Sequence, residues 1–184
     1  MQVPPVDTPS GVLEFFYNVT KFAQVLIFLF GAYQFWANRR ERLAADKVRD
    51  AQALKDSNYQ AWQVVNSAQG KGGSGGRIEA LANLAENGQS LAGVNADGAW
   101  LEGIDLRGAV LINASFRHAN LQGARLDGAN LKHADFEGAN LNAAQLAGAV
   151  LQGANVRHAR LSAANLKQAD LGELQGWEEI QAIT

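Results

Sequence analysis

The sequence contains no cysteine, and among its 184 residues there are only 3 prolines and 3 histidines. The lack of cysteine excludes disulfides, thiolate metal sites, iron–sulfur ligation and a cysteine nucleophile. A large net charge of either sign is also missing, because 16 basic and 18 acidic side chains give a formal net charge of -2. Surfaces that bind nucleic acid normally carry a clustered basic excess. The balance therefore argues against nucleic acid as a partner.

The longest apolar run lies near the N-terminus, where residues 11–37 contain only two charged side chains, Glu14 and Lys21. No charge occurs from Phe22 to Ala37, and extension back to Phe15 gives about 22 residues, enough to cross a hydrocarbon layer of ~30 Å. Residues 1–37 are thus expected to be a tail and a transmembrane helix. The alternative is a buried or interfacial helix.

Aromatic and basic side chains mark the ends of the expected span. Tyr17 lies near one end, and the other end carries the aromatic residues Tyr33, Phe35 and Trp36, followed by the basic residues Arg39, Arg40 and Arg42. The positive-inside rule then predicts a single-pass membrane protein with its N-terminus outside and residue 39 onward in the cytoplasm. Because the basic cluster follows the apolar run and no small-residue cleavage site appears there, we expect an uncleaved anchor.

A polar stripe interrupts the apolar surface of this helix. Its members, which recur at mostly three- and four-residue steps and so share roughly one helical face, are Glu14, Asn18, Lys21, Gln24, Gly31 and Gln34. Lipid would leave these polar groups without partners, so the stripe predicts a protein neighbour, here called the partner face. Another membrane subunit or a second copy would both bury it, and Gly31 permits close approach of helices.

The next segments have three different compositions. Residues 38–69 interleave charges of both signs in a helix-forming sequence, which predicts a helical connector with a weak indication of a coiled coil. Residues 70–76 are rich in Gly and Ser, typical of a flexible linker. Lys71 precedes these glycines and no strand comes before them, unlike in a phosphate-binding loop. Residues 77–88 are expected to form a capping helix that ends at Gly88.

From Ala99 the sequence repeats every five residues around an apolar centre. The centres are Leu101, Leu106, Leu111, Phe116, Leu121, Leu126, Leu131, Phe136, Leu141, Leu146, Leu151, Val156, Leu161, Leu166 and Leu171. The residue two positions before a centre is alanine, except at Ile104, and the residue between is often Asn or Asp. This pattern fits neither a helix of 3.6 residues per turn nor a strand of period two.

The repeat resembles the pentapeptide-repeat family. The resemblance implies a right-handed quadrilateral β-helix over residues 89–176, a β-solenoid in which each five-residue unit forms one side and about 20 residues make a coil. The central Leu or Phe would fill the interior, and the small residue would fit where a large one would clash. Leu91 and Ala96 can add a degenerate coil at the start, and residues 177–184 are expected to form a C-terminal cap.

The outward positions carry no recognisable catalytic motif. His118, His133 and His158 each lie two residues after a centre, and counting places His118 and His158 two coils apart, about 10 Å, with His133 on an adjacent face. These histidines are too dispersed to share a metal ion. The sequence therefore predicts no enzyme and no catalytic, cofactor or metal site.

A small apolar group is the candidate for protein contact on the solenoid. Counting places Val110, Ile112 and Val150 on one face, and Trp100 is also at an outward position. These four residues are called the contact patch. Ordinary surface, or packing of the patch against the connector that contains Trp62, is the alternative.

Together these features predict a non-enzymatic, membrane-anchored scaffold or accessory subunit of a membrane complex, without cofactor or nucleic acid. The alternative is a homo-oligomeric assembly or pore lined by the polar helix faces. Some relatives imitate DNA and bind topoisomerases, but the charges of residues 97–173 nearly cancel, and a DNA mimic needs a sustained negative potential.

Overall fold

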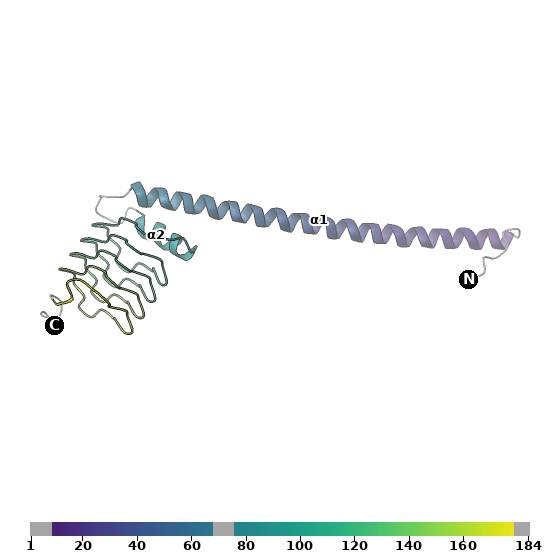
Figure 1. Cartoon of the computed structure of the whole chain (residues 1–184). Helices are drawn as coiled ribbons and strands as arrows, with labels where there is room; N and C mark the ends of the chain where they lie inside the picture. The colour runs from purple at the N-terminus through teal and green to yellow at the C-terminus, as the bar shows by residue number, and fades with distance from the viewer. Residues whose placement is uncertain (1–8, 68–75, 179–184) are drawn as a thin grey trace. The chain divides into compact units, whose positions relative to one another are not determined.

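The computed structural model describes residues 9–67 and 76–178, which divide between two compact units, Met1–Ala53 and Leu54–Thr184. One helix, α1 (Pro9–Ser67, 59 residues), contributes to both units, and a second helix, α2 (Arg77–Glu86), precedes the repeats (Figure 1). The sequence-based boundary at residue 37 is therefore a change in composition within a continuous helix. No proline interrupts α1 after its first residue, so its hydrogen-bond ladder has no obligatory break.

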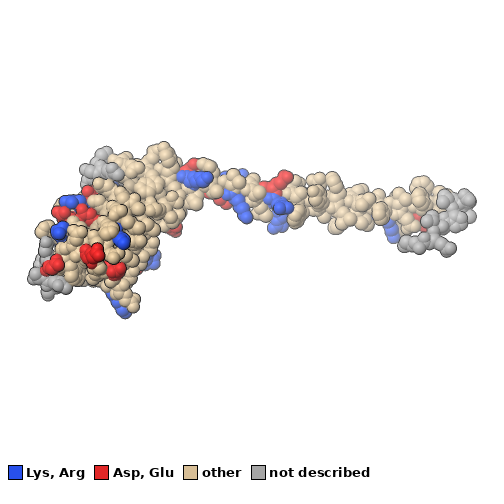
Figure 2. All heavy atoms as spheres, viewed as in Figure 1, with Lys and Arg blue, Asp and Glu red and all other residues tan. Residues whose placement is uncertain are grey.

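The first unit contains the apolar part of α1. One window of 18 residues within this helix reaches a mean hydropathy of 1.4, and none of that window is buried. Large apolar side chains are exposed along it, among them Ile27 at 72%, Phe28 at 74% and Phe35 at 68%. Figure 2 shows this stretch as a length of helix without charged atoms. The helix is long and apolar enough to cross a membrane.

In the second unit, the end of α1 packs with α2 and the first repeats. Ala61 and Val65 of α1 belong to the same buried cluster as Leu81 and Leu84 of α2. The Asn87 side-chain amide also donates a hydrogen bond of 2.7 Å to the Asn58 side chain. The capping helix expected at residues 77–88 corresponds in position to α2, which packs together with the last turns of α1. Most of the predicted linker lies outside the described residues.

The repeats form a four-sided solenoid. Parallel β-bridges join residues 20 positions apart in four columns, beginning with Asn95–Ser115, Trp100–Asn120, Asp105–Arg125 and Val110–Asn130. Each bridge is one residue long, so the sides of the coils are not extended strands in the part of the chain that the structure describes. The expectation of a β-solenoid is correct in its coil length and inward register, whereas the sides are single bridges between tight turns.

Each corner of the solenoid is a four-residue turn. The amide of the alanine after each corner donates to the carbonyl of the preceding centre, as from Ala124 to Leu121 at 3.0 Å. The third residue of each turn has a positive φ, for example +65° at Gly123. A type II turn requires this left-handed conformation, which glycine adopts without steric cost. A turn every five residues leaves room for only one ladder residue per side.

The interior is filled as the repeat predicts. The centres from Leu101 to Val156 are all buried, and Phe116 and Phe136 stack in adjacent coils with their ring centroids 5.3 Å apart. Leu91 and Ala96 are also fully buried, which confirms the degenerate first coil. The later centres from Leu161 to Leu171 are only partly buried. Of the expected C-terminal cap, Trp177 and Glu178 are helical, and residues 179–184 lie outside the described part.

Candidate interaction surfaces

The contact patch is split between two faces of the solenoid. Val110, Asn130 and Val150 lie in one bridge column, so Asn130 separates the two valines. Ile112 follows Val110 on the same face and is half-buried. Trp100 stands in a different column, paired with Asn120. The structure therefore groups three of the four residues and assigns Trp100 to another face.

Trp100 is surrounded by solvent and amide side chains. Its side chain is 55% exposed, whereas Trp62 of α1 is half-buried against the core cluster. The column that starts at Trp100 continues as Asn120 and Asn140, whose amides are joined by a 3.0 Å hydrogen bond. The alternative in which Trp100 packs against the connector is thus not what the structure shows. Trp100 remains available to a partner.

Charged side chains on a second face neutralise one another. Arg107 donates two hydrogen bonds to the two carboxylate oxygens of Asp105, at 2.8 and 2.7 Å, and Arg125 reaches the same carboxylate at 3.1 Å. The hydrogen bond from Arg107 lowers the pKa of Asp105, and the same bond raises the pKa of Arg107. Because the folded pKa of Asp105 is depressed, its stabilisation is present at neutral pH and is lost as the pH falls below about 4.

On a third face one arginine, Arg117, is shared by three carboxylates, those of Asp97, Asp135 and Glu137. Arg117 donates to Asp135 at 3.2 Å and lies 3.0 Å from a carboxylate oxygen of Glu137. Its backbone amide also donates to Asp97 at 3.0 Å. The arginine partly offsets the negative potential of these carboxylates. The arrangement does not resemble the continuous acidic wall that a DNA mimic requires.

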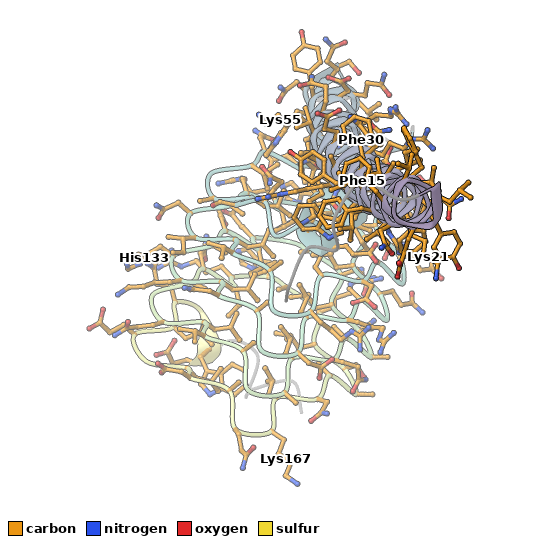
Figure 3. The ribbon with its side chains drawn as sticks, turned by 90° about the vertical axis from the view of Figure 1, so that its right-hand side faces the viewer. Phe15, Lys21, Phe30, Lys55, His133 and Lys167 are labelled. Carbon is orange, nitrogen blue, oxygen red and sulfur yellow. The ribbon has the colours of Figure 1, made fainter. Side chains whose placement is uncertain are left out.

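The three histidines occupy turn positions. All three are exposed and have φ values near +57°. They occupy the third position of their turns, which is glycine in most of the other turns. Figure 3 shows His133 projecting outward from the coils. Each of the first two rings lies over a glycine of the next coil, His118 over Gly138 and His133 over Gly153. No cluster of three or more potential metal-ligating His, Asp or Glu side chains occurs among the described residues.

We expect Gly138→Ala to destabilise the solenoid more than Gly148→Ala. Both glycines have φ of +66°, but a Cβ on Gly138 would overlap the His118 ring, whereas a Cβ on Gly148 meets nothing within 4 Å. The Gly148 change should cost about 1 kcal/mol for the left-handed conformation. The Gly138 change should cost about 1 kcal/mol more, because the ring must leave its rotamer.

Chemical denaturation of four proteins measures the coupling between Gly138 and His118: the unaltered protein, Gly138→Ala, His118→Ala and the double variant. In a His118→Ala background, the extra cost of Gly138→Ala should disappear. An extra cost that persists without the histidine ring would contradict the proposed stacking.

Among the described residues, Arg77 is the one charged residue that is buried. It opens α2 directly after Gly76, whose φ of +78° turns the chain into the helix, and its side chain is fully buried. Burial lowers the pKa of its guanidinium by desolvation. The helical periodicity of residues 77–88 gave no sign of this burial.

The partner face of α1 is exposed along its whole length. Glu14, Asn18, Gln24 and Gln34 are all exposed, and a Cβ on Gly31 would meet no atom within 4 Å. The Lys21 ammonium lies over the Tyr17 ring, 4.5 Å from its centroid and one turn closer to the N-terminus. Figure 3 shows Lys21 and Phe30 on opposite sides of the helix.

Comparison with known families identifies the repeat region. The family model described as Pentapeptide repeats matches residues 90–128 and 139–173, in 8 copies. The solenoid is a pentapeptide-repeat domain. The match covers the coils and their turns and does not extend into α1.

Several solved pentapeptide-repeat proteins are similar to about half of this chain. A protein from the Arabidopsis thaliana thylakoid lumen has 37% identity and a TM-score of 0.34, over 48% of this chain and 60% of that one. Rfr23 from the cyanobacterium Cyanothece 51142 has 34% identity and a TM-score of 0.25, over 46% and 57%. A protein from Nostoc Pcc 7120 has 28% identity and a TM-score of 0.32, over 58% and 98%. The search of curated proteins found no match.

Proposed function

We propose that the protein is a non-enzymatic scaffold or accessory subunit that α1 holds in a membrane and whose pentapeptide-repeat domain presents a rigid binding surface in the cytoplasm. The observation that carries this proposal is the exposure of the apolar part of α1. None of its most hydrophobic window is buried. A helix buried in a soluble protein core would cover these side chains, and an apolar surface of this size is typical of contact with lipid or protein.

The two ends of the apolar segment support insertion. The Lys21 ammonium is directed toward Tyr17 and thus toward the N-terminal end of the segment, the direction in which a lysine extends to reach the interface. At the other end, Trp36 is followed by three arginines within six residues. Interfacial aromatics and cytoplasmic arginines are typical of a single-pass protein with its C-terminal part in the cytoplasm.

The pentapeptide-repeat domain suits binding better than catalysis. Its outward histidines are spread over two faces, and Asp105 and Asp135 are both engaged by arginines. Catalytic groups need to converge on one reacting atom, which these side chains do not do. The backbone ladder between coils instead keeps each face in a fixed register. Such a wall can hold a partner with little loss of conformational entropy.

Replacement of Asn18 and Gln24 together by leucine is expected to preserve membrane insertion and to weaken partner association several-fold to tenfold. Leucine inserts more favourably than asparagine or glutamine. Polar contacts between membrane helices average under about 1 kcal/mol each, so the loss is partial. The measurement is recovery of the native complex from gently solubilised membranes, with mass spectrometry and sizing.

Leu26→Phe supplies the matched control, because Leu26 lies about 80° or more around the helix from every residue of the partner face and the change adds apolar volume without removing a polar group. Unchanged complex recovery in the double variant would refute the partner face. A chain recovered alone as a monomer would refute both an accessory subunit and a homo-oligomer. A complex that contains only copies of this chain would favour the homo-oligomeric assembly.

A further inference from the structure

Two shallow grooves lie side by side on α1, directly after the apolar segment. The first is lined by Phe35, Asn38, Arg39 and Arg42. The second, which shares Arg39, is lined by Trp36, Arg39, Arg40 and Leu43. In each groove the residues are spaced three and four apart, so they occupy neighbouring strips of the helix surface. Each groove therefore combines aromatic carbon with guanidinium groups.

The arginines of these grooves are not neutralised by carboxylates. Arg39, Arg40 and Arg42 form no ion pair within the described part of the chain, although Glu41 is their neighbour in sequence. Farther along α1, by contrast, Arg49 lies 3.4 Å from Asp46. The Arg40 guanidinium lies over the Trp36 ring, 5.5 Å from its centroid. The groove cations thus remain available to an external anion.

The position of the grooves indicates which anion they meet. If the segment Phe15–Trp36 crosses a membrane, Arg39 and Arg42 lie within about one and two helical turns of its end, at the depth of lipid headgroups. Guanidinium is planar and offers donors in a fork that matches two phosphate oxygens. Interfacial aromatic rings pack beside the glycerol and the first acyl carbons.

We propose that these grooves bind the phosphate of an anionic phospholipid in the leaflet that faces the pentapeptide-repeat domain. Arg39 contributes to both grooves, Arg42 and Arg40 complete the charge on either side, and Phe35 and Trp36 contact the lipid next to its headgroup. The inference rests on the proposed membrane insertion of α1. It adds a lipid preference that insertion alone does not require.

The test uses the full-length protein in nanodiscs that contain equal amounts of phosphatidylglycerol and phosphatidylcholine. Native mass spectrometry counts the lipids that the released protein retains. The unaltered protein is expected to retain phosphatidylglycerol in excess over its share of the bilayer. The triple variant Arg39→Gln, Arg40→Gln, Arg42→Gln should lose this excess, since each basic side chain near an anionic surface contributes roughly a fivefold preference.

Three further measurements distinguish bidentate binding of phosphate by arginine from non-specific electrostatic attraction to the membrane. Lys47→Gln with Arg49→Gln removes two positive charges farther along α1 and should leave the excess unchanged. The triple lysine variant Arg39→Lys, Arg40→Lys, Arg42→Lys keeps the charge but loses the fork, so its excess should fall below that of the unaltered protein. Millimolar inorganic phosphate should not displace the lipid.

Several results would overturn the inference: an unchanged excess in the glutamine variant, an equal loss in the Lys47 and Arg49 variant, full retention with lysines, or displacement by inorganic phosphate. Alkaline extraction of the same samples distinguishes failure of the proposed function. A protein released by carbonate is not membrane-inserted, and both ideas then fall. A protein that stays inserted without lipid preference refutes the grooves alone.

Discussion

Replacement of Leu131 by aspartate should lower the free energy of unfolding of the pentapeptide-repeat domain by several kcal/mol. Leu131 is fully buried, and its neighbours on the same side in the adjacent coils, Leu111 and Leu151, are buried as well. An aspartate there would place a charge among alkyl groups with no partner, which is among the most destabilising changes a core can receive. Loss of the leucine contacts adds to this cost.

Lys132→Ala is the matched control, because Lys132 follows directly in sequence and points outward, with its backbone amide donating to the Asn130 side chain. Removal of this half-buried side chain should change stability by less than about 0.5 kcal/mol. Chemical denaturation of the full-length protein measures both variants. Equal shifts for the two substitutions would show that the inward register is wrong.

The second large effect is expected at the cover of the first coil. Val65 of α1 is fully buried in the cluster that includes Leu81, so Val65→Asp should also cost several kcal/mol. Val48 on the same helix is 71% exposed, and Val48→Asp should be nearly neutral. Val65→Asp should weaken the packing of α1 and α2 over the first coil. Backbone amides near Leu91 should therefore exchange hydrogen faster in this variant than in the unaltered protein.

Hydrogen exchange resolved by mass spectrometry decides between a cover and a loosely attached helix. Equal exchange rates in the first coil of the unaltered protein, Val65→Asp and Val48→Asp would mean that α1 does not help to cover this coil. Similar destabilisation by Val65→Asp and Val48→Asp would lead to the same conclusion.

The solenoid was predictable from sequence because its rule is local and repeated. Every centre from Leu101 onward specifies the same inward position, so an error at one repeat, such as Ile104 in place of alanine, changes nothing in the register. The glycines two residues after many centres also carried a turn signal that pointed to left-handed φ. The turns explain why the sides are single bridges. The signal was incomplete in the sequence, because eight of these turn positions in the described coils carry a residue other than glycine, three of them histidine.

Two helices cover the first coil, and only α2 was predicted to do so from the sequence. The contribution of α1 depends on contacts between segments that are distant in the sequence. The composition of residues 38–69 predicted a connector helix without assigning a packed face to Ala61 and Val65. The burial of Arg77 gave no sequence signal either, since arginine at the start of a helix is normally exposed. The burial of Ala61 and Val65 depends on α2 and the first coil, with which they share one buried cluster.

The candidate surfaces were predictable to the extent that they depend on counting. A coil of 20 residues places Val110, Ile112 and Val150 together without any knowledge of side-chain packing, and the bridges align Val110 with Val150 in one column, with Asn130 between them. The same count assigns Trp100 to a different face. Whether the partner face of α1 binds another protein depends on a molecule outside this chain, so it stays a prediction.

The account depends most directly on the topology of α1, which carbonate extraction and cysteine labelling measure together. The chain has no native cysteine, so Ser90→Cys and Leu13→Cys each provide one reactive thiol, both at positions that are exposed in the structure. We predict that the protein resists extraction at high pH, that a membrane-impermeant reagent labels position 13 from outside, and that position 90 reacts only after permeabilisation. Release by carbonate, or labelling of position 90 in intact cells, would contradict a membrane-anchored cytoplasmic pentapeptide-repeat domain.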